Sequence, residues 1–322
     1  MADHMSDGGE APEGVAFTNL DQELFDGADA TKRDLIDYFD AVQARIIPCL
    51  RDRPLSVIRI RPGQPPFMQK NLPNYTPEWV ARVGIWADAS RREVSYALCN
   101  DLRTLLWFAN QRAVEYHVTL FSMAEPMHPD YLVLDLDPPE GATFDVVIQA
   151  ARLVHQALDE AGMAGAVKTS GAKGLHIFVP LASGTSPEDA AAATRAIAVR
   201  AERIDPDLAT TAFVKEERQG KVFLDSTRAG GATVVAAYSP RIRPGVPVSF
   251  PVLWDDLDRV VPADFTIRNA AGVLQQRDPW ADQMPAAQQL DADLVAEGHA
   301  IPVARVQAMH EGKRRARSRR DS

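Results

Sequence analysis

The most constraining stretch of the sequence is an apolar run at residues 131–134 that leads into Asp135 and Asp137 and then into two prolines. A short apolar run of this kind predicts a buried strand, and side-chain alternation places both carboxylates on one side of it. The prolines cannot continue strand pairing, so the carboxylates stand at the strand's end. Two like charges this close need a shared proton or a cation, and hard ions such as Mg2+ or Mn2+ prefer oxygen ligands. The alternative is that both residues are solvated acids in a turn. An Asp-x-Asp motif considered alone favours this alternative, because single motifs often match by chance.

Composition indicates an ordinary globular chain. Its 322 residues suffice for one large or two medium domains, with 46% hydrophobic and 25% charged residues. No run approaches the roughly 18 apolar residues of a membrane span, and the polar, acidic start is unlike a secretory signal. Two cysteines, Cys49 and Cys99, argue against a disulfide framework and fit a reducing cytoplasm. Because the net charge is -9, any nucleic acid must be bound by local basic patches.

Hydrophobic periodicity and turn residues divide the chain into elements. We expect disorder over residues 1–16, a loop at 62–66 that presents residues 67–70, and a solvated basic tail at 313–322. Helices are predicted at residues 32–48, 102–111, 146–161 and 187–204. Strands are predicted at residues 55–60, 92–97, 116–120, 174–179 and 221–225.

A third carboxylate strengthens the metal hypothesis. Asp225 ends a second apolar strand, as Asp135 and Asp137 end the first. Carboxylates at the ends of neighbouring strands can share a metal site, and two metal ions held there would activate a hydroxyl and neutralise a leaving pyrophosphate.

Two further groups of residues favour binding of phosphate. A glycine-punctuated loop carries Ser170, Lys173 and His176, and such loops offer backbone N–H groups to phosphate oxygens. Arg241 and Arg243 follow a strand, one residue apart, so both could face a triphosphate. Taken singly, the histidine is better explained as a satisfied core residue, and the lysine and arginines as surface residues. Their co-occurrence is what indicates a site.

With these motifs in view, the sequence resembles the polymerase domain of bacterial non-homologous end-joining ligases of the LigD type and their stand-alone relatives, in the archaeo-eukaryotic primase superfamily. The resemblance runs in the family's order from about residue 18 to about residue 258. The matching segments are residues 31–38, 67–70, 135–138, 169–176, 221–225 and 238–245.

The resemblance implies a mixed α+β fold of the primase type, in which an RRM-like sheet carrying the carboxylates packs with an N-terminal α/β module. We therefore expect one primase-polymerase domain over residues 17–312. Its expected parts are an N-terminal module at 17–125, an RRM-like module at 126–260 and a C-terminal extension at 261–312.

The resemblance also implies an activity and its ligands. The family adds NTPs or dNTPs to a DNA 3' end under the direction of a template, in end joining or gap filling, with two Mn2+ or Mg2+ ions. The metal ligands would be Asp135, Asp137 and Asp225. The nucleotide would be held by Ser170, Lys173, His176, Arg241, Arg243, His117, Phe67 and Met68, and a downstream DNA 5'-phosphate by Asn19 and Lys32. The partners would be gapped or broken DNA and a separate ligase or end-binding protein, at the nucleoid in the cytoplasm and without a membrane.

The chain departs from the family pattern at three positions. Met68 stands where a second aromatic ring is usual, and a base stacked on a ring gains about 1–3 kcal/mol. Gln22 stands where a lysine is usual in the 5'-phosphate site, and a lysine often found before Thr233 is missing. These departures bear on DNA binding and leave the chemistry unchanged.

Two other functions remain as alternatives. An apolar strand ending in Asp-x-Asp also opens the haloacid-dehalogenase phosphohydrolases, with a late acidic pair such as Asp255 and Asp256. Here Pro138 follows the motif and 130 residues precede Tyr131, unlike that family. A catalytically silent nucleic-acid-binding module is the second alternative, and retention of all three carboxylates argues against it.

Overall fold

The computed structural model describes residues 12–61, 63–87, 91–228 and 232–303. Most of the expected disordered N-terminus and the basic tail at 313–322 lie outside these residues. The described residues include the last five positions, 12–16, of the segment expected to be disordered. Val15 is only 5% exposed and packs into the core of the first module, because an apolar side chain gains free energy there that a polar segment would not.

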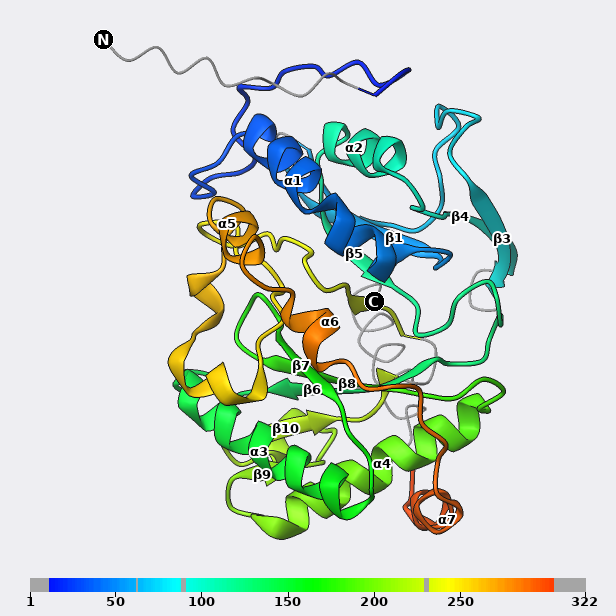
Figure 1. Cartoon of the computed structure of the whole chain (residues 1–322), viewed down its shortest axis with the longest axis vertical. Coiled ribbons are helices and arrows are strands. Elements are labelled where there is room, and N and C mark those ends of the chain that lie inside the picture. The colour runs from blue at the N-terminus through cyan, green and yellow to red at the C-terminus, as the bar shows by residue number, and fades with distance from the viewer. Residues whose placement is uncertain (1–11, 62, 88–90, 229–231, 304–322) are drawn as a thin grey trace, which may run out of the picture.

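The first module is a sheet covered by two helices (Figure 1). In the described residues its strands run in the order β11-β5-β1-β4-β3, with β2 also paired to β1. The strands are β1 (Leu55–Arg61), β2 (Gln64–Gln69), β3 (Arg82–Ala87), β4 (Arg92–Ala97), β5 (Ala113–Val118) and β11 (Val234–Val235). The helices are α1 (Lys32–Leu50) and α2 (Leu102–Asn110). A capping box between Thr31 and Asp34 begins α1, which continues past Pro48 into its last turn.

The second module is a sheet with helices on one face. Its strands run in the order β7-β8-β6-β10-β9 and are antiparallel except for the pair β10–β9. The strands are β6 (Tyr131–Asp137), β7 (Ala166–Thr169), β8 (Leu175–Pro180), β9 (Ala209–Thr210) and β10 (Val222–Asp225). The helices are α3 (Phe144–Glu160) and α4 (Pro187–Ile204), with the short 3-10 helix η1 (Lys215–Glu217) before β10. The strand–helix–strand–strand–helix–strand succession confirms the expected RRM-like sheet.

The C-terminal part of the chain contributes to both modules, and the division at residues 126–260 and 261–312 stays a prediction. After β10 the chain returns to the first module: β11 pairs with β5, and Tyr238, Val248 and Phe250 join its core. Helix α7 instead packs on α4, and its Leu294 lies in the second core. Sequence patterns do not show such a crossing. The elements in this part are η3 (Trp254–Arg259), η4 (Pro262–Asp264), α5 (Ala270–Leu274), α6 (Pro279–Gln283) and α7 (Ala292–Ala300).

Two further details differ from the sequence prediction. The predicted loop at 62–66 is partly strand, because β2 begins at Gln64 and continues through two prolines. Proline is tolerated at irregular pairings, and the β1–β2 register shifts between Arg59 and Arg61. Strand β7 was not predicted at all. No helix among the described residues is both long and apolar enough to cross a bilayer.

Candidate active site

The carboxylates predicted to share a site meet at the end of the second sheet. Asp225 on β10 lies directly opposite Asp135 on β6, and Asp137 follows two residues along the same strand. These side chains share one face, because the intervening Leu136 and Leu224 point into the helix-covered core. Asp135 and Asp225 are 8% and 6% exposed, whereas Asp137 reaches the surface.

Arg228 lies between the two buried carboxylates. Its Nη2 is 2.6 Å from Oδ2 of Asp135 and 3.2 Å from Oδ2 of Asp225. Nε2 of His176 lies 3.2 Å from the other oxygen of Asp135. Burial alone would raise the pKa of Asp135, but His176 and Arg228 outweigh burial and hold that pKa well below its usual value. Thr227 donates to Oδ1 of Asp225 through its backbone N–H (2.8 Å) and its hydroxyl (2.6 Å).

Asp137 opens onto a hollow lined by cations. Loss of hydration and the negative charges of Asp135 and Asp225 raise the pKa of Asp137 to about 6. The hollow has a volume of about 330 Å³, and beside Asp137, Glu140 and the prolines it is lined by Lys173, Lys215, Arg218 and Lys221. Of these cations, Lys173 alone was predicted from the sequence to bind phosphate. Positive charge next to clustered carboxylates is suited to a polyphosphate that arrives with a cation.

The donor set fits a hard divalent ion. In the described part of the chain, no group of acidic, histidine or cysteine side chains is already gathered as a metal site, and Arg228 supplies the positive charge between Asp135 and Asp225. Carboxylate oxygens are the ligands that Mg2+ and Mn2+ prefer. A cation at the cluster would offset the repulsion between Asp137 and the charges of Asp135 and Asp225.

The loop between β7 and β8 is shaped by glycines. Gly171 has φ +67°, and a Cβ on Gly174 would lie 2.1 Å from the carbonyl oxygen of Leu136. The Ser170 hydroxyl accepts hydrogen bonds from the backbone N–H groups of Ala172 (3.2 Å) and Gly174 (3.1 Å). Ser170 is thus buried and holds the turn together, while Lys173 at the tip is exposed.

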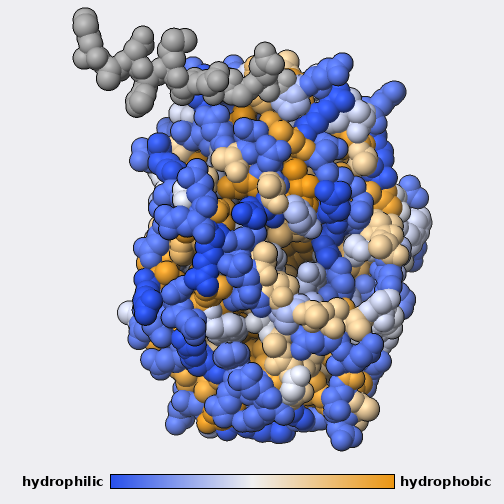
Figure 2. Space-filling view, viewed as in Figure 1, coloured by the Kyte–Doolittle hydropathy of each residue, from blue (hydrophilic) through white to orange (hydrophobic). Residues whose placement is uncertain are grey.

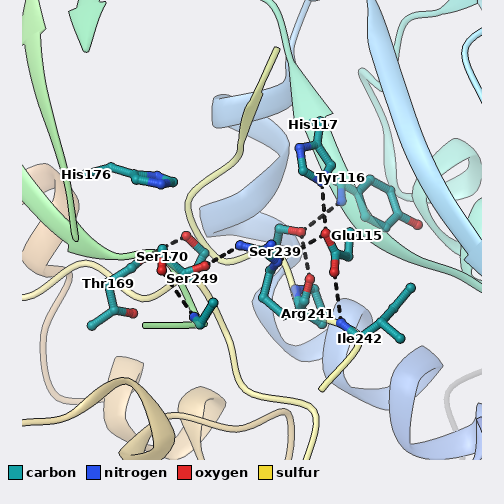
Figure 3. A network of polar contacts seen from close by, with 12 residues as sticks. Glu115, Tyr116, His117, Thr169, Ser170, His176, Ser239, Arg241, Ile242 and Ser249 are labelled. Atoms are coloured by element: carbon teal, nitrogen blue, oxygen red, sulfur yellow. Dashed lines mark hydrogen bonds and ion pairs between the residues drawn. The ribbon is translucent and has the colours of Figure 1, made fainter. Parts of the chain in front are cut away.

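A polar network from the first module closes the site (Figure 3). Glu115 on β5 accepts from the His117 ring at 3.0 Å and pairs with Nε of Arg241 at 3.1 Å. Arg241 also donates from Nη1 to the Ser170 carbonyl oxygen, 2.5 Å away. Burial would raise the pKa of Glu115, but His117, Arg241 and the backbone N–H of Ile242 lower it to about 2. Glu115 therefore joins the loop, the histidine and one arginine, and it was not identified from the sequence.

Other predicted nucleotide ligands lie apart from this network. Arg243 is exposed, two residues beyond Arg241. Phe67 and Met68 are on β2 in the first module, where successive side chains point to opposite faces. The guanidinium of Arg61 lies over the Phe67 ring, 4.3 Å from its centroid, while Met68 is 45% exposed. The two side chains cannot form one stacking surface.

Of the two predicted 5'-phosphate ligands, Asn19 lines a separate hollow near the N-terminus and Lys32 does not. Asn19, which has φ +51°, lines this hollow of about 650 Å³ together with Gln22 and Arg33. Lys32 is 3% exposed, and its ammonium donates to the carbonyl oxygen of Thr18. Burial and the charge of Arg112 lower the pKa of Lys32. Arg33 is thus the cation that faces the hollow.

A second cavity, of about 350 Å³, lies between the two modules and α6. Apolar side chains gather around a hollow in the middle of the face shown in Figure 2. Its lining includes Cys49, Tyr131, Phe178 and Trp280 and lacks the three carboxylates. The candidate active site is therefore identified by its carboxylates and cations.

Comparisons with known proteins agree with this geometry. Residues 31–280 match the family described as "LigD, primase-polymerase domain". The chain is 34% identical over 258 residues to the bifunctional non-homologous end joining protein LigD of Bacillus subtilis, covering 79% of the chain and 41% of that protein. It is 33% identical over 262 residues to the multifunctional non-homologous end joining DNA repair protein LigD of Mycobacterium tuberculosis, covering 78% of the chain and 34% of that protein. The chain thus spans about two fifths or less of these curated relatives.

A solved structure supports the same assignment. The polymerase domain of Mycobacterium tuberculosis ligase D in complex with DNA superposes with a TM-score of 0.78 at 30% identity, covering 85% of this chain and 99% of that one. This match confirms the expected primase fold. The chain belongs to the LigD primase-polymerase domain family.

Proposed function

We propose that this protein is a template-directed nucleotidyltransferase that adds NTPs or dNTPs to a DNA 3' end in end joining or gap filling. The observation that carries the proposal is the meeting of Asp135, Asp137 and Asp225 beside a cation-lined hollow. Family membership supports it, and the solved relative is a polymerase domain in complex with DNA.

Each part of the site has a role in this reaction. Asp135, Asp137 and Asp225 would hold two Mg2+ or Mn2+ ions. Such ions, when bound, lower the pKa of an attacking hydroxyl and neutralise the leaving pyrophosphate. Arg228 reduces repulsion between Asp135 and Asp225.

The remaining groups would bind the incoming nucleotide and position it. We assign to the triphosphate the cations and polar groups that border the carboxylates, and to the base or sugar the residues on the first module. The triphosphate set is Ser170, Lys173, His176 and Arg241. Lys215, Arg218 and Lys221 line the hollow beside it and would contact DNA phosphates. The first-module set is His117, Phe67 and Met68, with Arg243 at its edge.

The DNA itself would lie across local basic surface, since the chain carries a net charge of -9. Asn19 and Lys32 stay the predicted 5'-phosphate residues. Arg33, which pairs with Asp21 at 3.2 Å in the same hollow, is the cation beside Gln22. A separate ligase or end-binding protein would complete the repair, beside the nucleoid.

Primer extension tests the proposal. A DNA with a short gap is offered with and without a downstream 5'-phosphate, with NTPs or dNTPs, and with Mn2+ or Mg2+. Template-dependent extension is expected, and its absence under all conditions would overturn the proposal. Family membership removes the basis for a haloacid-dehalogenase activity. DNA binding without extension would instead indicate a silent binding module.

A further inference from the structure

Lys168 is a fully buried cation that the proposed reaction does not use. It lies on β7 with 0% exposure, and its Nζ is 2.8 Å from Nδ1 of His176 and 2.6 Å from Oγ of Ser249. The Phe178 ring lies 5.5 Å from Nζ. Burying an ammonium or amine costs free energy unless hydrogen bonds replace water, so the position of this side chain requires an explanation.

The strand register places Lys168 in a row that crosses the sheet. Lys168 is opposite His176 in the β7–β8 pair, and His176 is opposite Asp135 in the β8–β6 pair. Asp225 is opposite Asp135 in the next pair. Directly paired residues share a face and lie side by side, so four strands present Lys168, His176, Asp135 and Asp225 as one line of contacts.

The groups at the two ends of this row, Ser249 and Asp135, determine which atom donates in each polar contact between them. Ser249 Oγ donates to the Thr169 carbonyl oxygen at 2.8 Å, so it accepts from Lys168. At the other end, Nε2 of His176 lies 3.2 Å from Oδ1 of Asp135, and because a carboxylate can only accept, this contact requires a hydrogen on Nε2. In a neutral imidazole the other nitrogen is then bare, and Nδ1 accepts from Lys168.

We propose that Lys168 is a positioning residue that holds the His176 ring by Nδ1, so that its Nε2–H faces the carboxylate cluster and the phosphate bound there. Lys168 itself touches neither nucleotide nor Asp135. The phosphate part of this inference rests on the proposed function, whereas the orientation and tautomer of the ring do not.

Nuclear magnetic resonance of the histidine ring nitrogens tests the inference directly. The chain has seven histidines, and the signals of His176 are identified by their loss in His176→Gln. The wild-type protein is expected to show the Nε2–H tautomer at this residue. A wild-type ring protonated on Nδ1 alone would overturn the proposal, whether or not any variant folds or extends DNA.

The variant Lys168→Met removes the donor and keeps an unbranched apolar chain. We expect the Nδ1 signal of His176 to shift in this variant, because the bare nitrogen has lost its donor, while Asp135 keeps the hydrogen on Nε2. Ser249→Ala is the matched control, since it removes the other partner of Lys168 and leaves the lysine–histidine bond. An unchanged Nδ1 signal in Lys168→Met, or an equal shift in Ser249→Ala, would assign Lys168 to packing alone.

Nucleotide affinity provides the second readout. Titration with a fluorescent NTP is expected to show binding about tenfold weaker for Lys168→Met, the size of one hydrogen bond to a charged group. His176→Gln should weaken binding similarly, and the double variant no further. A double variant that loses the full product of both factors would show that Lys168 acts independently of His176. Failure of the wild type to bind nucleotide would overturn the proposed function and leave the tautomer result standing.

Discussion

Asp225 and Asp135 face each other directly across the antiparallel pair of β10 and β6, and one guanidinium, that of Arg228, contacts both. The strand register thus brings two carboxylates close enough to repel each other, and Arg228 in the loop after β10 reduces that repulsion. The register also explains why two carboxylates distant in sequence can act together.

Replacing Asp225 with Asn should abolish primer extension while preserving the fold. Asn keeps an oxygen for the Thr227 hydrogen bonds but removes the charge that a divalent ion needs. We expect a loss of about 10²–10³-fold in the extension rate, corresponding to several kcal/mol of charge stabilisation. Asp255→Asn, at an exposed position, is the matched control and should extend normally. Normal extension by Asp225→Asn would contradict the assigned site.

Replacing Arg228 with Gln should make stability depend on divalent ions. Without the guanidinium, the buried carboxylates of Asp135 and Asp225 repel each other, at a cost of about 3–5 kcal/mol. In chelator the variant should melt below wild type, and Mn2+ should raise its Tm more than that of wild type. Arg259→Gln, at a side chain 79% exposed, should show neither effect. Equal Mn2+ responses in all three proteins would place the ion elsewhere.

Glu115 should contribute to acid unfolding. Its folded pKa is about 2 and its ordinary value 4.5, so the folded state favours the charged form. The resulting stability is present above pH 4.5 and is lost as the pH falls toward 2. At neutral pH the shift corresponds to roughly 3 kcal/mol as an upper bound.

Denaturant titrations from pH 7 to pH 2 check this prediction. Glu115→Gln should flatten the acid limb of the stability curve, whereas Glu78→Gln, at an exposed position, should follow wild type. An acid limb in Glu115→Gln as steep as that of wild type would remove Glu115 as a cause.

Gly174 should tolerate no side chain. A Cβ there would lie 2.1 Å from the backbone oxygen of Leu136, so Gly174→Ala must displace either β6 or the loop. We expect a loss of about 1–3 kcal/mol, measured by urea unfolding, and a higher KM for nucleotide. Gly272→Ala on α5 is the control, because nothing lies within 4 Å of its Cβ. The loop assignment fails if the two variants behave alike.

The cations that line the hollow of Asp137 should make DNA binding weaker as the salt concentration rises. Lys221→Gln should weaken binding to gapped DNA and reduce the slope of log affinity against log salt by about 1, as expected for the loss of one phosphate contact. Arg152→Gln on α3, which covers the other face of the sheet, should leave the slope unchanged. An unaltered slope for Lys221→Gln would exclude this hollow from the DNA path.

The sequence predicts local features of this protein better than long-range ones. The end of β6, the helix from Pro187 to Ile204 and the strand ending at Asp225 follow from periodicity, prolines and caps, which act over a few residues. Strand β7 was missed because it has four residues and includes Lys168, a cation that local patterns assign to the surface.

The residues that complete the site were also missed for a physical reason. Glu115 and Arg228 acquire their roles from partners brought near by the sheet register and by the return of the chain to β5. Taken alone, each is an ordinary charged residue. Arg228 did offer one local signal, because it lies three residues beyond the carboxylate that ends β10.

The separation of these partners along the chain affects how the protein folds. Arg228 and Asp135 are 93 positions apart, the Glu115 contact with Ile242 spans 127, and the Tyr38 hydroxyl donates to the Tyr238 carbonyl across 200. Contacts of such separation form slowly, because long segments must be ordered before they meet. Helical structure should therefore return early during refolding and nucleotidyl transfer last, which makes catalytic activity a report that the entire chain has reached its native state.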